Sequence, residues 1–391
     1  MRSRNVFAAV TCAILVLATS SSAALGQNES ADNRLLTGII ATGEDSPPPC
    51  SETMVDPSPW AGCGDMGGWQ SSCCPRWTAS ADFILLDRIG GGNQTLVETV
   101  PRSVSFSKLF TTPGTEVLNS SDLQQGFSGG PRIDLIRHDD SGYDLEVSYF
   151  QIGGWSSDRT VAPDPANAWL VMRAPGTWLF SKSPWIQTNQ QASQAMVWDY
   201  STELQNAELN ARWNPSSRVT MLAGFRWVNL GENLAGTLDP IPSKLSHWYF
   251  WNGTTTNNLY GFQIGADGKL WERGRFSIDG LVKAGIFDND AEATTAVSVI
   301  HKSMYSGSDS SNHAAFVGET GLQCKYQVTQ RLLLRAGYEV IWLEGVALAP
   351  EQVQETYITT KWRNSTVQAL GVNCNSGVFY HGATGGLEYS F

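Results

Sequence analysis

The chain has 391 residues, a formal net charge of −11 and only 16% charged residues. Nucleic-acid binding requires clustered positive charge, so this acidic composition excludes nucleic acid as a partner. The 38 glycines and 15 tryptophans favour strands and turns over amphipathic helices.

The first 26 residues have the pattern of a secretory signal peptide. Arg2 and Arg4 supply a positive end, and an apolar run follows over residues 6–18. Small residues near Gly26 indicate cleavage there, so the mature chain is expected to be exported and to begin at Gln27. No later run approaches the roughly 18 apolar residues that a membrane-spanning helix needs.

Residues 27–76 are rich in Pro, Gly, Ser and Cys, and are predicted to form a periplasmic extension or a plug. An oxidising compartment favours disulfides, here two bridges among four cysteines, Cys50, Cys63, Cys73 and Cys74. A tetrathiolate metal site is the alternative, although CxxC spacing is missing. This extension is also where a periplasmic cell-wall partner is expected to bind.

From Trp77 onward, apolar and polar residues alternate with the period of a half-buried strand. Short turns join four pairs of such runs, which are 132–138 with 143–151, 196–213 with 218–230, 259–272 with 275–287, and 314–327 with 331–343. Long polar stretches at 152–195, 231–257, 288–312 and 344–376 separate the pairs and are predicted to be loops. Short turns at one end and long loops at the other are typical of an outer-membrane barrel.

The end of the chain resembles a barrel-closing strand, with Leu387, Tyr389 and Phe391 on one face. With 77–87 as the first strand, the count is ten, and residues 103–110 and 118–127 would raise it to twelve. The predicted fold class is therefore all-β, an antiparallel transmembrane β-barrel over residues 77–391 with about 10–12 strands, short periplasmic turns and long outer loops.

Charged residues on the polar face of these strands are predicted to line the lumen, either as salt-bridge networks or as a selectivity filter. They are Arg132, Asp134, Glu146, Glu208, Arg212, Lys283, Glu319, Lys325, Arg331, Arg335 and Glu339. Cys324 and Cys374 are expected at opposite ends of the lipid band, about 25 Å apart, and therefore not to pair with each other.

Residues 126–130 fit the G-x-S-x-G pattern of a hydrolase nucleophile, but a strand and not the required helix is predicted to follow. The five histidines have no tight metal spacing, and no cofactor is expected. Two alternatives remain open. One is a hydrolase at the barrel rim that uses His247 or His301. The other is a soluble secreted β-sandwich that binds glycans through Trp155, Trp169, Trp178 and Trp185.

Three segments resemble a family of outer-membrane β-barrel proteins that is abundant in planctomycetes. They are residues 74–86 (CPRWTASADFILL), residues 129–137 (GGPRIDLIR) and the final GLEYSF. The resemblance covers about residues 73–391 and implies an outer-membrane barrel, with no catalytic residue to carry over. We expect a porin-like passive channel for small polar solutes or a structural barrel of the envelope, without enzymatic activity. Its expected partners are outer-membrane lipid and the barrel-assembly machinery.

Overall fold

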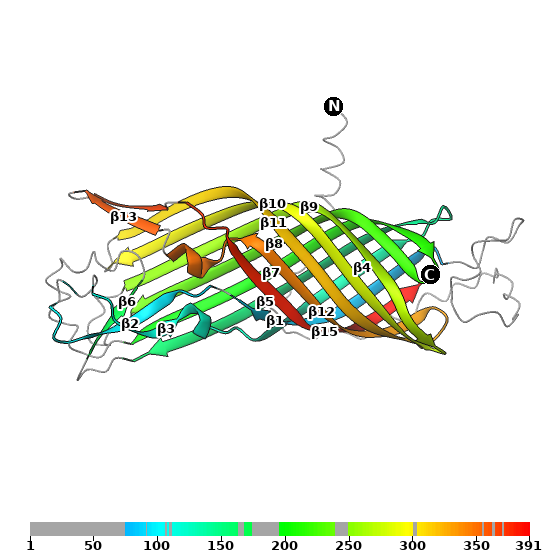
Figure 1. Ribbon diagram of the computed structural model, residues 1–391, viewed down its shortest axis with the longest axis horizontal. Helices are drawn as coiled ribbons and strands as arrows, with labels where there is room; N and C mark the ends of the chain where they lie inside the picture. The colour runs from blue at the N-terminus through cyan, green and yellow to red at the C-terminus, as the bar shows by residue number, and fades with distance from the viewer. Residues whose placement is uncertain are drawn as a thin grey trace, which may run out of the picture. The chain divides into compact units, whose positions relative to one another are not determined.

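Ten antiparallel strands form a closed barrel in the part of the chain that the structure describes. This structure is a computed structural model, which describes residues 75–90, 92–105, 108, 112–162, 168–173, 195–238, 249–299, 303–353, 356–361, 364–369 and 371–391. In order around the barrel (Figure 1) the strands are β1 (Trp77–Ile89), β15 (Ser376–Ser390), β12 (Leu332–Val346), β11 (Ser303–Gln327), β10 (Phe276–Val299), β9 (Tyr249–Arg273), β8 (Val219–Leu238), β7 (Met196–Ser216), β5 (Tyr143–Val161) and β4 (Phe127–Arg137). The predicted fold class is confirmed, with the lower of the two strand counts.

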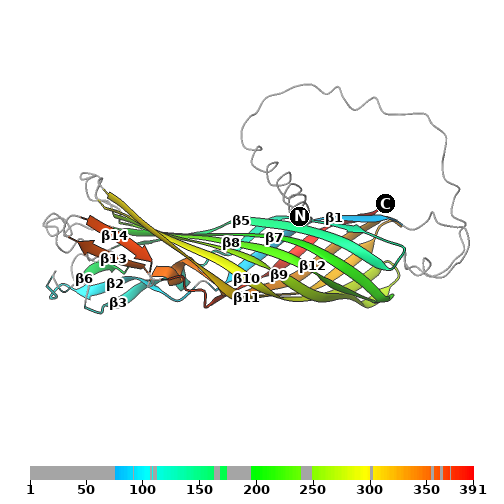
Figure 2. The same ribbon diagram turned by 90° about the horizontal axis from the view of Figure 1, so that it is seen from above.

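Neither of the two segments that would have raised the count to twelve forms a barrel strand of its own: the described residues of 103–110 contain no strand, and 118–127 lies mostly outside the barrel strands. β2 (Thr95–Pro101), β3 (Thr115–Asn119) and β6 (Ala168–Met172) form a separate three-stranded sheet, and β13 (Thr356–Lys361) pairs with β14 (Asn364–Ala369). Both small sheets lie at the end of the barrel opposite the C-terminus (Figures 1 and 2). The count of twelve is wrong because β1 and β4 pair directly along their lengths, from Trp77↔Arg137 to Asp87↔Phe127, and leave no edge for insertion.

Among the described residues, the 3-10 helices η2 (Ser120–Asp122) and η5 (Ala349–Val353) lie in the connections between these elements. Across the described residues, no helix is long and apolar enough to cross a membrane.

Several strands continue far beyond their predicted ends. β9 and β11 have 25 residues each and β10 has 24, so much of 249–257, 288–299 and 303–312 is strand where loops were predicted. The pairing of β10 with β9 runs without interruption from Asp279↔Lys269 to Val299↔Tyr249. The loop prediction failed because strand ends that extend beyond the lipid still pair through their backbone. Their outer face no longer has to be apolar, so the alternation of apolar and polar residues disappears there.

The outward side chains of the barrel are large, apolar and exposed. Phe262 is 76% exposed, Ile264 70% and Ile286 75%. A soluble protein rarely leaves a continuous apolar surface of this kind in water, whereas hydrocarbon requires it. The soluble β-sandwich is therefore wrong, and the apolar stripes face outward instead of into a sandwich core.

The barrel closes between its first and last strands. β1 pairs with β15 from Thr78↔Ser390 to Ile89↔Phe379. Beyond these pairs, the Phe391 carbonyl accepts from the amides of Arg76 at 2.9 Å and Trp77 at 3.0 Å, and the Phe391 amide donates to Trp77 at 2.9 Å. The side chains of Leu387, Tyr389 and Phe391 are 45–54% exposed on the outer face.

Deletion of Phe391 should destabilise the closed barrel, because it removes three backbone hydrogen bonds at the seam, each contributing about 1 kcal/mol. We expect a lower midpoint of urea unfolding in lipid and less of the compact gel band that unboiled barrels show in SDS. Phe391→Ala keeps these backbone bonds and serves as the control. If both variants lowered the unfolding midpoint equally, the aromatic ring of Phe391 would account for the effect and the backbone hydrogen bonds at the seam would not.

Candidate functional site in the barrel lumen

Four charged side chains from neighbouring strands form a compact cluster in the lumen. Arg226 of β8, which is 1% exposed, lies 2.9 Å from Glu319 of β11 and 3.5 Å from Glu208 of β7. Lys283 of β10 lies 2.9 Å from Glu208 and 3.5 Å from Glu319. The two cations and two carboxylates compensate one another, which is the condition under which charges can be buried.

Neutral amides add hydrogen bonds to this cluster. Gln263 donates to Glu208 at 2.7 Å, and Asn206 accepts from Nε of Arg226 at 2.6 Å. Buried ionic groups need such additional partners to offset the loss of hydration.

A second cluster lies on the side of the seam. Arg335 of β12 pairs with Asp82 of β1, with Asp134 of β4 at 2.7 Å and with Glu388 of β15 at 3.3 Å. Arg132 forms a bidentate pair with Glu339, with distances of 2.6 and 3.0 Å. These contacts tie the first and last strands to their neighbours through side chains as well as backbone.

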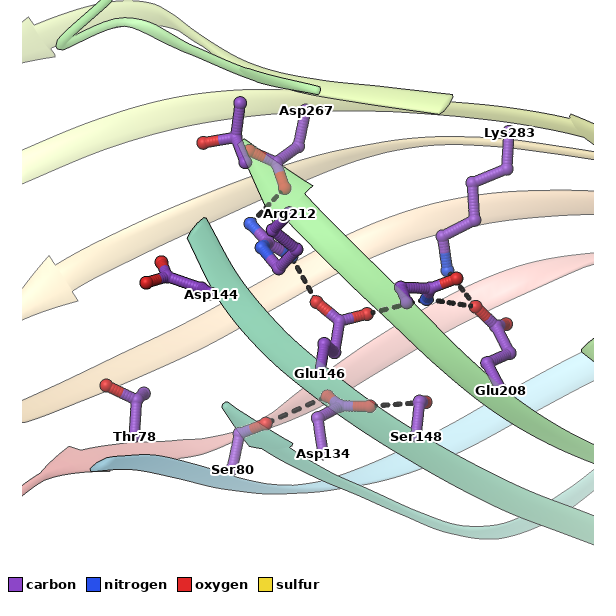
Figure 3. Close-up of polar contacts among 12 residues, drawn as sticks. Thr78, Ser80, Asp134, Asp144, Glu146, Ser148, Glu208, Arg212, Asp267 and Lys283 are labelled. Carbon is purple, nitrogen blue, oxygen red and sulfur yellow. Dashed lines mark hydrogen bonds and ion pairs between the residues drawn. The ribbon is translucent and has the colours of Figure 1, made fainter. Parts of the chain in front are cut away.

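A third group lies nearer the short turns. Arg212 lies between Glu146 and Asp267 and forms an ion pair with each (Figure 3). In the same region the carboxylate of Asp134 accepts hydrogen bonds from the hydroxyls of Ser80 and Ser148. In the same view Lys283 and Glu208 point toward one another from different strands. Lys325 lies 3.0 Å from Asp279 and 3.8 Å from Glu388.

Ten of the eleven predicted lumen residues take part in these ion pairs. The exception is Arg331, which lies in the turn before β12 and is exposed at the rim, because the short turn ends one residue later than the alternation implied. Five partners were missing from the predicted set: Asp82, Arg226, Asp267, Asp279 and Glu388. Their position on the polar face of each strand was the signal that could have found them.

An apolar layer crosses the lumen on the long-loop side of the charges. Every barrel strand except β4 contributes to it, and each member is 5% exposed or less. The wall residues are Ile84, Leu86, Phe150, Ile152, Trp155, Leu204, Val228, Leu230, Leu259, Phe287, Ala315, Val317, Ile341, Leu343, Val378 and Tyr380. A water-filled passage through this layer would leave its lining side chains exposed, so the layer is a packed seal.

The end of β12 and the segment that follows it fold into the lumen above this layer. Asn257 of β9 donates to the Ala347 carbonyl at 2.8 Å and accepts from the Ala347 amide at 2.7 Å. Asn289 donates to the Gly345 carbonyl at 2.9 Å, where the glycine has a φ of +81° that L side chains rarely adopt. Val346 and Leu348 thereby join the apolar layer.

Glu232 of β8 holds the next turn of this segment. Its carboxylate accepts from the Ala349 amide at 2.9 Å and from the Tyr200 hydroxyl at 2.8 Å, and it pairs with Arg88. Ala349 and Val353 then pack with residues of β2, β3 and β6 and with Trp198 and Trp251. The segment predicted as an outer loop thus helps to close the mouth of the barrel.

A hydrogen-bonded chain at the short-turn end joins four strands or their turns. Nδ1 of His138 lies 3.0 Å from a carboxylate oxygen of Asp144, and Nε2 of His138 lies 2.9 Å from the Thr78 hydroxyl. That hydroxyl lies 3.0 Å from the hydroxyl of Ser390. The order carboxylate, imidazole, hydroxyl resembles a hydrolase relay. However, Thr78 is only 5% exposed and shares its hydroxyl with Ser390, so the chain fastens the seam and presents no accessible nucleophile.

Other candidate residues are dispersed or lie outside the described residues. Trp155 is fully buried, with Nε1 donating to the Leu86 carbonyl at 3.1 Å, and so forms no exposed stacking platform, while Trp169 is half-buried. Ser128 lies in β4 and donates to the Gly153 carbonyl at 2.7 Å, so the G-x-S-x-G segment is a strand. The candidates that fall outside the described residues are Cys50, Cys63, Cys73, Cys74, Trp178, Trp185, His247 and His301.

Cys324 and Cys374 are both free, the first on the outer face of β11 and the second buried. Within the described ranges, no group of three or more His, Cys, Asp and Glu side chains is placed to hold a metal ion.

A family model described as Putative beta barrel porin-7 (BBP7) matches residues 78–391. Similar solved structures include the outer membrane protease OmpT from Escherichia coli, with 9% identity, a TM-score of 0.39 and coverage of 81% of this chain and 96% of that one. The toluene transporter TodX of P. putida has 11% identity, a TM-score of 0.33 and coverage of 81% and 90%. Similarity this low carries no functional argument. No curated protein matches the chain.

Arg226→Ala should destabilise the barrel by about 3–5 kcal/mol, because it leaves Glu208 and Glu319 buried with one cation between them. The measurement is urea unfolding in lipid vesicles. Arg331→Ala, at an exposed position with no ion pair among the described residues, should change stability by no more than about 0.5 kcal/mol. If Arg226→Ala lowered the free energy of unfolding as little as the control does, water would have to enter the cluster and hydrate the two carboxylates.

Proposed function

The chain belongs to the Putative beta barrel porin-7 family, and we propose that it is an outer-membrane barrel closed to solutes, with a structural role in the envelope. The observation that carries this proposal is the apolar layer across the lumen, whose members are 5% exposed or less. The family name suggests the alternative, a passive channel for small polar solutes.

The apolar layer opposes conduction directly. An ion that crosses it must give up its hydration without gaining a polar partner, which costs several kcal/mol even after the protein relaxes. A neutral polar solute also loses its hydration in this layer, which costs about 2–7 kcal/mol for each polar group left without a hydrogen-bond partner. Hydrophobic constrictions of this kind close channels by excluding water.

The charges below the layer support the same conclusion. A selectivity filter needs fixed charges that are free to attract the permeating ion. Here the charged side chains compensate one another at 2.6–3.5 Å, as in the Arg132–Glu339 and Lys283–Glu208 pairs. Of the two readings of the lumen charges, the salt-bridge network is therefore the one that the geometry favours.

The proposal assigns no covalent chemistry to the barrel. A hydrolase at the rim would instead depend on His247 or His301. Lipid or peptide hydrolysis by the purified protein that disappears in His247→Ala or His301→Ala would overturn the structural role.

The purified barrel should show no conductance steps in a planar lipid bilayer, and vesicles that contain it should not swell in a small sugar. The triple variant Leu230→Ala, Phe287→Ala, Ile341→Ala should introduce conductance, because it removes large side chains from three strands of the layer. Ile264→Ala, on the lipid face and 70% exposed, is the matched control.

Each variant must first show the compact band of a folded barrel in unboiled gels. Regular conductance steps from the unmodified protein would contradict the closed lumen and favour the passive channel.

A further inference from the structure

Six arginines surround the short-turn end of the barrel. All six are exposed, and each lies in a turn or at the end of a strand that reaches this rim. They are Arg76, Arg137, Arg218, Arg273, Arg275 and Arg331, and we call them the arginine ring.

The backbone holds four members of the ring at separate points of the circumference. In each case the arginine carbonyl accepts an amide from the neighbouring strand or its turn, at 2.8–2.9 Å. The four pairs are Arg76 with His138, Arg218 with Lys269, Arg275 with Gln327, and Arg331 with Ser390. The hydrogen-bond ladder therefore continues to the rim, and the positions of these arginines are set by the barrel itself.

The ring takes no part in the ion-pair networks described for the lumen, and its member Arg137 interacts electrostatically with Asp139 in the adjoining turn. Among the described residues none of the six forms an ion pair, whereas Arg132, Arg212, Arg226 and Arg335 inside the lumen all do. Several acidic side chains at this end already have partners, among them Asp144 with His138 and Asp267 with Arg212. Asp139 and Asp140 lie in the turn next to Arg137, and Glu272 pairs with Lys269 at 3.0 Å.

A girdle of exposed aromatic side chains lies on the lipid side of the ring. Its members are 37–60% exposed and include Trp77, Tyr143, Trp213, Trp271, Phe276, Tyr389 and Phe391. Trp213 pairs with Tyr143 across the β5–β7 ladder, and Phe276 packs on Tyr326 with ring centroids 4.7 Å apart. Tryptophan and tyrosine concentrate at the depth of lipid headgroups, which places the arginines at the same level or just beyond it.

The protein as a whole is acidic. The chain as a whole has a formal net charge of −11. On the outer face of β10 above the lipid stripe, the exposed residues Asp288, Asp290 and Glu292 repeat at alternate positions. General attraction between the protein and an anionic surface is therefore not expected from its net charge.

We infer that the arginine ring binds the phosphate groups of anionic phospholipids in the periplasmic leaflet of the outer membrane. The planar guanidinium group offers paired donors that match two phosphate oxygens, which suits it to this ligand better than the ammonium group of lysine. Headgroups at the girdle would lie within reach of exposed guanidinium groups around the barrel. The inference stands independently of whether the lumen conducts.

The test measures lipid binding by the full chain in detergent, using native mass spectrometry with equal amounts of phosphatidylglycerol and phosphatidylcholine. We expect the unmodified protein to retain phosphatidylglycerol preferentially. Arg273→Gln with Arg275→Gln should reduce that preference about fivefold for each arginine removed. Arg273→Lys with Arg275→Lys should lose less, because the charge remains and only the paired donors are lost.

Arg159→Gln, at an exposed position in β5 far from the ring, is the matched control and should leave the preference unchanged. Each variant must retain the compact gel band. If the double variant does not fold, Arg218→Gln and Arg331→Gln, tested singly, replace it.

Four outcomes would overturn the inference. Equal retention of both lipids would remove the headgroup specificity, and a preference that persists in the ring variants would place the site elsewhere. In a third outcome, millimolar inorganic phosphate displaces the lipid and binds as tightly as the lipid does. That result would identify a general anion site and not a membrane contact. Retention only of acidic cell-wall polymer would identify a different partner.

Discussion

Backbone hydrogen bonding in lipid is the constraint on which this structure depends. Hydrocarbon offers no partner to an amide or a carbonyl, so a sheet that crosses it must have no open edge. Here the constraint is met where β1 pairs with β15, twelve residue positions along the seam, and where the backbone of Phe391 adds contacts to Arg76 and Trp77. The side-chain contacts of His138, Thr78 and Ser390 reinforce the same junction.

The small number of strands determines what the lumen can contain. Barrels of eight strands have an interior that side chains fill, and ten strands add little width. In a lumen this narrow, charged side chains from different strands reach one another, so Arg226, Lys283, Glu208 and Glu319 pair instead of facing water. The apolar layer next to them keeps water away from these pairs and so strengthens them, and in the proposed function it closes the passage.

The two ends of the barrel differ in physical character. At the C-terminal end the strands stop in short turns next to the lipid girdle, with basic side chains at the rim. At the other end β8 to β11 continue beyond the lipid stripe, and the small sheet of β2, β3 and β6 packs inside them through Leu96, Val97 and Met172. One end therefore carries the basic rim for which we infer a membrane contact, while the other forms a capped structure of its own.

The sequence by itself determined the all-β class, the outward stripes and the location of the short turns, because alternation and turn residues are local properties of the chain. It also placed most lumen charges on the inward face, since a residue such as Glu208 or Arg335 needs only its strand parity for that assignment. It did not determine which charges pair. Arg335 contacts Asp82, 253 positions away, and only closure of the barrel brings them together.

Strand length and the closure of the mouth were likewise decided by the tertiary structure. The polar residues of 288–299 resemble a loop when read alone, yet they remain in β10 because β9 and β11 pair with them on both sides. The segment after β12 turns into the lumen because Asn257, Asn289 and Glu232 hold its backbone there. Such contacts depend on strands that are distant in sequence, so no local pattern could reveal them.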